Sequence, residues 1–120
     1  MISFEEVVAV EPEFIRVTTT GRYEFRELFP FLDRVKALAE SERRTQILID
    51  SRALDGQMTE AERFSGGQKI AEVFGSRYRI ALMMPENTIT KLGELTAVNR
   101  GAIFLVTPSE VEAVKWLRSG

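Results

Sequence analysis

Polar side chains that could bind a ligand gather directly after one predicted buried strand. Residues 46–50 form a short apolar run that ends in Asp50, and Ser51, Arg52 and Asp55 follow it closely. In open α/β sheets, ligands bind at the carboxyl ends of the strands, so these side chains are candidates for recognition. Together with polar residues further along the chain, the candidate ligand- or partner-binding residues are Asp50, Ser51, Arg52, Asp55, Met58, Thr59, Pro85 and Asn87.

Asp50 lies where an aspartate could accept a phosphoryl group, as in a receiver domain. A receiver also needs acidic residues after its first strand to hold Mg²⁺, and a lysine after its last strand. Here residues 18–20 are threonines, and Thr107-Pro108 follows the last predicted strand. The receiver interpretation therefore fails, and the pattern favours a structural loop network of Asp50, Arg52 and Asp55.

The segment Ser65-Gly66-Gly67-Gln68-Lys69 resembles a phosphate-binding loop in composition but not in spacing. The glycine-lysine pattern of a P-loop is absent, and no predicted strand runs directly into these glycines. A serine–lysine dyad would need a Ser-x-x-Lys spacing, which Ser65 and Lys69 do not have. We expect the glycines to interrupt a helix or to allow its close approach to the sheet.

The chain has 120 residues but no histidine and no cysteine, which excludes many chemistries. Thiolate nucleophiles, Ser-His-Asp triads, structural zinc sites and disulfides all need residues that it lacks. The net charge of -2, with no basic stripe, argues against nucleic-acid binding. No apolar run approaches the roughly 20 residues of a membrane span, and the acidic start is unlike a signal peptide. We expect one cytoplasmic, non-enzymatic domain over residues 1–120, with no catalytic residue, metal or cofactor.

Apolar periodicity in the first part of the chain predicts two strands and a helix. Residues 7–10 and 14–19 are β-prone and flank a turn at 11–13, which indicates a hairpin. Residues 24–40 then follow a helical period, and Pro30 should kink this helix or mark the start of its longer part. The apolar stripe of the helix consists of Phe25, Leu28, Phe29, Leu32, Val35, Leu38 and Ala39.

The remaining chain alternates between buried strands and helices. Strands are predicted at residues 46–50, 79–83 and 102–106, with a polar loop at 51–58. Thr59 and Glu62 form a capping box that begins a helix ending near Gly75. A helix at 90–100 should turn Leu92, Leu95 and Val98 inward. The last helix should begin at a second capping box, Thr107 to Glu110, with Pro108 in its first turn.

This order of elements, β-β-α-β-α-β-α-β-α, predicts an α/β fold. Strands separated by single helices require right-handed crossovers and a mostly parallel sheet of about five strands. The opening hairpin places an antiparallel strand at the edge of that sheet.

With these elements laid out, the sequence resembles the SpoIIAA-like, STAS-type family of small bacterial domains over roughly residues 7–117. The resemblance rests on the order and spacing of several segments rather than on a catalytic motif. These segments are residues 23–32 with their internal proline, Ile47-Leu48-Ile49-Asp50, Leu54-Asp55-Gly56, Arg79-Ile80-Ala81-Leu82, Asn99-Arg100-Gly101 and residues 112–117.

The resemblance implies a non-enzymatic regulatory module that acts by switching protein partners. In classical STAS domains, an anti-sigma kinase phosphorylates a serine at the start of the helix after the central strand. Here the usual Asp-Ser-(Ser/Thr)-Gly signature is replaced by Gln57-Met58-Thr59-Glu60, and Ser51 comes too early. We therefore expect a module without the usual phosphoserine switch, in which Thr59 is a helix cap.

Two functions stay open at this point. The first is a protein-interaction module. The sequence also predicts a homodimer, because an edge hairpin with Val7, Val8 and Val10 offers unpaired backbone groups. The second is a binding domain for a small apolar ligand or lipid, which the resemblance to the wider fold group also allows. An apolar cavity near the strand ends would favour the ligand, and an exposed apolar patch would favour the partner.

Overall fold

The computed structural model describes residues 4–120, which form one mixed five-stranded sheet. The strands are β1 (Phe4–Val10), β2 (Ile15–Arg22), β3 (Gln46–Asp55), β4 (Arg79–Met83) and β5 (Ile103–Thr107). They are ordered β1-β2-β3-β4-β5; β1 pairs antiparallel with β2, and all other pairs are parallel. The predicted α/β class, strand number and antiparallel edge hairpin are confirmed.

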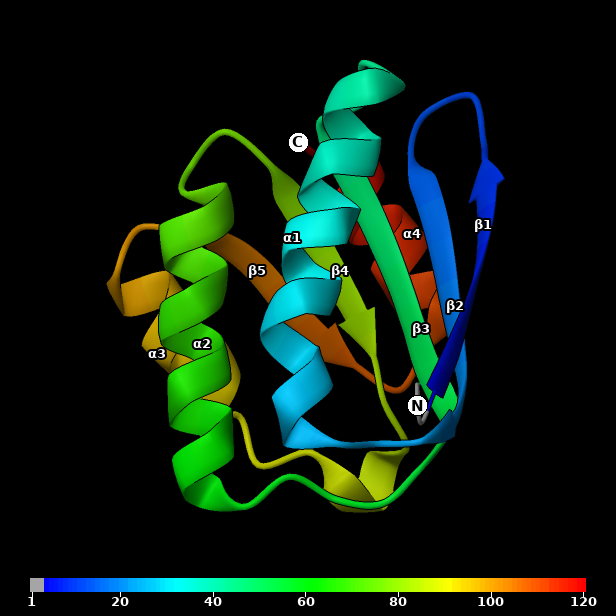
Figure 1. Cartoon of the computed structure of the whole chain (residues 1–120). Helices are drawn as coiled ribbons and strands as arrows, with labels where there is room; N and C mark the ends of the chain where they lie inside the picture. The colour runs from blue at the N-terminus through cyan, green and yellow to red at the C-terminus, as the bar shows by residue number, and fades with distance from the viewer. Residues whose placement is uncertain (1–3) are drawn as a thin grey trace.

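Helices cover both faces of this sheet, as Figure 1 shows. The helices α1 (Phe25–Ser41), α2 (Glu60–Phe74) and α3 (Leu92–Asn99) are all crossovers between neighbouring parallel strands. Right-handed crossovers in a sheet that grows in one direction place them on one face. The last helix, α4 (Glu110–Arg118), follows the final strand and packs on the opposite face.

Each face of the sheet has its own apolar core. Ile47 and Ile49 of β3 pack with the larger core beneath α1, α2 and α3. Leu48, between them in sequence, packs with Ala113 and Leu117 of α4. This alternation is the two-residue period of a strand covered on both sides.

Three element boundaries differ from those predicted. Residues 51–55 are not a loop, because they extend β3 and pair with the end of β2 beyond a register shift at Thr18/Thr20. The first helix runs from Phe25 through Pro30 without a break. The predicted second capping box is wrong: Thr107 ends β5, and the Ser109 hydroxyl accepts from the Glu112 amide at 3.1 Å to cap α4.

The glycines of α2 explain two further differences. They do not interrupt α2; a Cβ on Gly67 would lie 2.5 Å from the Gly93 carbonyl oxygen and 2.8 Å from the Thr96 Cβ. Close approach is thus to α3 rather than to the sheet. Because α3 turns its small residues toward α2, Leu95 and Val98 face outward, at 56% and 45% exposure, and their predicted burial is wrong.

The two edge strands of the sheet, β1 and β5, differ in what covers their outer side. On β1, Val7, Val8 and Val10 are exposed, so the feature behind the expected homodimer is present, and the dimer itself stays a prediction. On β5, the Val106 amide donates to Glu94 at 2.7 Å, and its carbonyl accepts from the Lys91 ammonium. Side chains of α3 and the residue before it therefore cover the polar groups of this edge.

Candidate functional site

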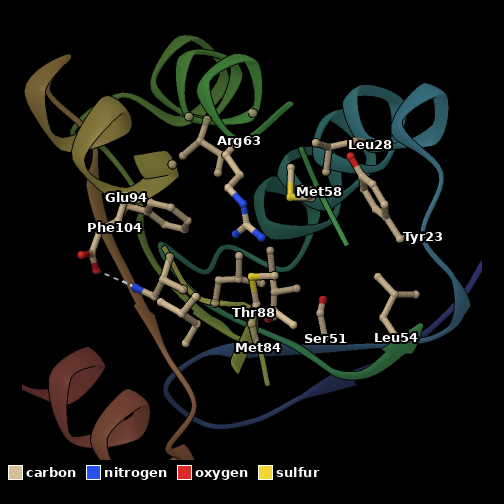
Figure 2. Close-up of a pocket in the computed structure, with 18 of the residues that line it drawn as sticks. Tyr23, Leu28, Ser51, Leu54, Met58, Arg63, Met84, Thr88, Glu94 and Phe104 are labelled. Carbon is tan, nitrogen blue, oxygen red and sulfur yellow. Dashed lines mark hydrogen bonds between the residues drawn. The ribbon is translucent and has the colours of Figure 1, made fainter. Parts of the chain in front are cut away.

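A cavity of about 120 Å³ lies between the sheet and the three helices of its larger core. Its wall is formed mostly by apolar side chains, and the residues that line it come from every strand of the sheet and from all three helices. It reaches the carboxyl ends of β3 and β4, where Leu54 and Met84 line it (Figure 2). Apolar residues that line the interior include Leu28, Phe31, Ile49, Ile70, Phe74 and Phe104.

One charged side chain, Arg63 of α2, points into the middle of this apolar wall (Figure 2). Arg63 is only 8% exposed. Its Nε atom is buried without a hydrogen-bond partner, and the guanidinium donates none to any residue of 4–120. The Glu60 carboxylate lies 3.3 Å from Nε, but Glu60 is itself 64% exposed. A buried arginine with so few partners is an unusual feature of a folded domain.

The other polar side chains in the wall do have partners. The Thr19 and Ser51 hydroxyls share a hydrogen bond of 2.8 Å, and the Thr88 hydroxyl donates to the Pro85 carbonyl at 2.8 Å. The Tyr23 hydroxyl donates to Glu62 at 3.2 Å. Because Lys91 and Glu94 pair with β5, Arg63 is the cation of the described wall that donates no hydrogen bond within residues 4–120, and its ion pair is with the exposed Glu60.

Of the residues predicted from the sequence, the structure brings Ser51, Met58 and Pro85 together in this cavity. Ser51 enters it because it continues the face of β3 that carries Ile47 and Ile49. Met58 and Pro85 follow β3 and β4, whereas Ser51 lies within β3, which extends to Asp55; that these residues contact a ligand stays a prediction.

Asp50 and Arg52 lie on the other face of β3, toward α4. The Arg52 guanidinium donates to both Asp50 carboxylate oxygens at 2.9 Å and to Glu110 at 3.1 Å. This pairing lowers the pKa of Asp50 against the opposing effect of burial, and raises the pKa of Arg52. Arg16 joins the same network through Glu110. These residues form a structural ion-pair cluster outside the cavity wall.

Asp55, Thr59 and Asn87 also lie outside the cavity wall. Thr59 is the cap of α2: its hydroxyl accepts from the Glu62 amide, and the Glu62 carboxylate accepts from the Thr59 amide, both at 3.1 Å. Thr59 and Glu62 line a separate shallow depression with Tyr23. Burial, together with the Glu62 carboxylate, raises the pKa of Tyr23, so its hydroxyl stays protonated as a donor.

Sequence reasoning missed Arg63, although a signal was present. Arg63, Gly67, Ile70 and Phe74 share one helical face of α2, and the structure buries all four. A lone charge on an otherwise apolar or small-residue stripe marks a position where a buried cation needs a partner. Tyr23 and Leu28 were missed as cavity residues because the cavity is assembled only when α1 packs over the sheet.

Within residues 4–120, no group of three or more carboxylates is placed to hold a metal ion. No helix in the same range is long and apolar enough to span a bilayer.

No family model matches the chain, and no curated protein matches it. Solved structures do. An anti-sigma factor antagonist from Mycobacterium paratuberculosis superposes with a TM-score of 0.66 at 15% identity, covering 97% of this chain and 95% of the other. The unphosphorylated anti-sigma factor antagonist SpoIIAA gives a TM-score of 0.55 at 16% identity, covering 98% and 97%. The chain has the SpoIIAA-like fold.

A third SpoIIAA-like structure supports this assignment. It is an uncharacterised protein of the DUF3478 family from Shewanella loihica, with a TM-score of 0.55 at 16% identity, covering 96% of this chain and 94% of the other. The resemblance predicted from the sequence is thereby confirmed for the fold, whose whole length is shared. At these sequence identities the comparison shows the fold alone, and the function has to be argued from the residues of the site.

Proposed function

We propose that this SpoIIAA-like protein is a non-enzymatic binding module whose cavity takes up a small apolar molecule. The observation that carries the proposal is the cavity of about 120 Å³ with its apolar wall, open near the ends of β3 and β4. Pockets of this kind, apolar with few convergent polar groups, are typical of small-molecule sites.

The size of the cavity limits the size of the molecule. An engineered apolar cavity of about 150 Å³ holds benzene, so this one suits an apolar group of about one six-membered ring. Longer molecules would have to extend through the opening past Leu54 and Met84. Met58 and Met84 in the wall have flexible, polarisable side chains that adapt to different shapes.

The same wall supports a binding role rather than catalysis. Its Ser51 hydroxyl is paired with the Thr19 hydroxyl at 2.8 Å, and a hydroxyl does not act as a general base at neutral pH. Lys91, the other cation in the wall, is held by Val106 and Glu94. These groups do not form the pair of a nucleophile and a neighbouring base that acyl or phosphoryl transfer would use.

Benzyl alcohol, a neutral probe of about the right size, tests this function. We expect the amide NMR signals of cavity residues such as Gly66 and Thr88 to shift as benzyl alcohol is added, and the shifts to reach a plateau. Ala113 and Leu117 on the opposite face serve as the internal control and should not shift. The proposal would be contradicted if the signals of the cavity residues stay unchanged with benzyl alcohol, with benzamide and with benzoate.

A second candidate function, binding of a regulatory protein partner, is favoured by an exposed apolar patch. Phe64 of α2 is 41% exposed, and Leu95 and Val98 of α3 are more so. The Arg100 guanidinium lies 5.3 Å from the Phe64 ring centroid, which joins the two helices at this surface. Because two proteins of this fold are anti-sigma factor antagonists, the partner that we propose is an anti-sigma factor.

We propose that partner binding of this kind does not use the phosphoserine switch, because Gln57-Met58-Thr59-Glu60 stands in place of the usual serine signature and the Thr59 hydroxyl caps α2. Leu95→Asp should abolish binding of an anti-sigma factor from the same cell. The matched control is Val111→Asp on α4, which changes an exposed apolar residue on the other face. Equal binding by both variants would contradict the patch as the docking surface.

A further inference from the structure

We propose that the molecule bound in the cavity is a small monocarboxylic acid, and that Arg63 recognises its carboxylate. This inference rests on the proposed ligand-binding function and deepens it by naming the chemical class of the ligand. Its apolar body is an aromatic ring or a branched aliphatic group of about six carbons, since the cavity has room for a benzene-sized group.

The unmatched donors of Arg63 are the first argument. The side chain is more than nine-tenths buried, yet its Nε has no hydrogen-bond partner, and its guanidinium points among apolar side chains (Figure 2). Leaving such a group unpaired is costly, whereas a carboxylate could accept two parallel hydrogen bonds from the planar guanidinium. The other polar side chains of the described wall are already engaged with one another or with the backbone.

Glu60 does not remove the need for such an anion. Its carboxylate lies 3.3 Å from Nε without hydrogen-bond geometry, and it also accepts from the Thr90 hydroxyl at 3.1 Å. With 64% of its side chain exposed, Glu60 neutralises the arginine only weakly through solvent. The terminal nitrogens of Arg63 are left for a ligand.

The charge around Arg63 selects a monoanion. Arg63 offers one positive charge, and the carboxylates of Glu60 and Glu94 are also nearby in the site. Lys91 is the only other cation in the described wall, and Glu94 already pairs with it at 3.2 Å. A phosphate dianion would bring a second negative charge without a second free cation, so a carboxylate fits this site better.

The test compares benzoate with benzamide, two probes of nearly the same shape that differ in charge. At pH 7 benzoate is ionised, because free carboxyl groups titrate near pH 4. We expect the wild-type protein to bind benzoate about 10- to 100-fold more tightly than benzamide, as charge-assisted hydrogen bonds imply. Calorimetry gives the affinities, and amide NMR shows that the probe lies in the cavity.

Variants then assign the preference to Arg63. Arg63→Leu should bind both probes with equal affinity, and Arg63→Lys should keep part of the preference, because it retains the charge without the planar fork. Arg77→Leu makes the same change at an exposed arginine outside the cavity wall and should keep the full preference. The comparison of probes on the wild type holds even where a variant fails to fold.

Several results would overturn the inference. These are equal binding of benzoate and benzamide by the wild type, an undiminished preference in folded Arg63→Leu, or tighter binding of phenyl phosphate than of benzoate. If benzyl alcohol and benzamide bind in the cavity while benzoate does not, the proposed function stands and the inference about Arg63 is wrong. If none of these probes binds, the proposed function itself fails.

Discussion

Two arginines on opposite faces of the same sheet differ in how their donors are used. Arg79 of β4 lies on the α4 side, and its guanidinium donates to the Trp116 carbonyl at 2.8 and 3.0 Å and to Ser119 at 3.0 Å. It also lies over the Trp116 ring, 4.0 Å from its centroid. Arg63 is buried more deeply but donates no hydrogen bond within residues 4–120.

We interpret Arg79 as a structural arginine and, under the proposed function, Arg63 as an arginine that recognises a ligand. Arg79 donates to the Trp116 carbonyl oxygen near the C-terminal end of α4, where cations are favoured by the helix dipole. On that face, Ala113 and Leu117 are fully buried against the sheet, whereas the other face contains the cavity. The α4 face of this chain is thus the closed face, and the ligand that we propose would bind on the other, the cavity face.

The largest expected effect on stability is at the close contact between α2 and α3 on the cavity face. Gly67→Ala should lower the free energy of unfolding by about 2–3 kcal/mol, because its Cβ would collide with the Gly93 carbonyl and Thr96. Gly66→Ala is the matched control, since its Cβ would meet only the ends of Leu28 and Met58, at 3.4 and 3.5 Å. It should be neutral or add up to about 1 kcal/mol. Equal losses in urea unfolding would contradict the close α2–α3 contact.

The second prediction compares the two arginines directly. Arg79→Leu should lower the free energy of unfolding by about 2 kcal/mol, because it removes two hydrogen bonds from the guanidinium to the Trp116 carbonyl and the contact with the ring. Arg63→Leu should leave the stability of the ligand-free protein unchanged or raise it, because an apolar residue replaces a poorly paired buried charge. A similar loss in both variants would show that Arg63 is structural.

Thr59 provides the third, intermediate effect. Thr59→Ala should lose about 1 kcal/mol of stability, because the Glu62 amide loses its acceptor. Thr59→Ser and Thr59→Asp should retain most of it, since each still offers an oxygen to the first turn of α2. Partner binding should be the same for the wild type and both of these variants. A stable aspartate variant that selectively gains or loses a partner would instead indicate a phosphoacceptor.

The smallest effect concerns the ion pair of Asp50 on the closed face. Because Arg52 lowers the pKa of Asp50, the pair stabilises the fold above the ordinary aspartate value near 3.9. That contribution is lost as the pH falls through the lowered value in the folded protein. Asp50→Asn should therefore cost up to about 1 kcal/mol at pH 7, and its difference from the wild type should shrink toward pH 2. A difference independent of pH in chemical denaturation would contradict this role of the pair.

The fold could be predicted from the sequence because periodicity reports burial directly. The β-prone residues 14–19 predicted a strand, and the structure forms β2 there and buries Ile15, Val17 and Thr19. The capping box at Thr59 located the start of α2. Boundaries were less certain where tertiary pairing decided them: β3 extends to Asp55 only because β2 is long enough to pair with it.

The site could be predicted only in part, because a cavity is a property of packing between distant segments. Strand-end reasoning found Ser51, Met58 and Pro85, but it could not tell that Asp50 and Arg52 face α4. Sequence reasoning did not identify Arg63 as a cavity residue, because a charged residue within a helix is normally exposed. Its burial follows from the close α2–α3 contact at Gly67, which local patterns did not predict.

The most direct test of the account measures unfolding of the wild type and Arg63→Leu in urea, each with and without benzoate. A ligand that binds only the folded state raises the free energy of unfolding by about 1.4 kcal/mol at ten times its Kd. The account predicts this gain for the wild type and almost none for Arg63→Leu at the same benzoate concentration, although the two are about equally stable without it. Equal gains in both proteins, or no gain in the wild type, would contradict it.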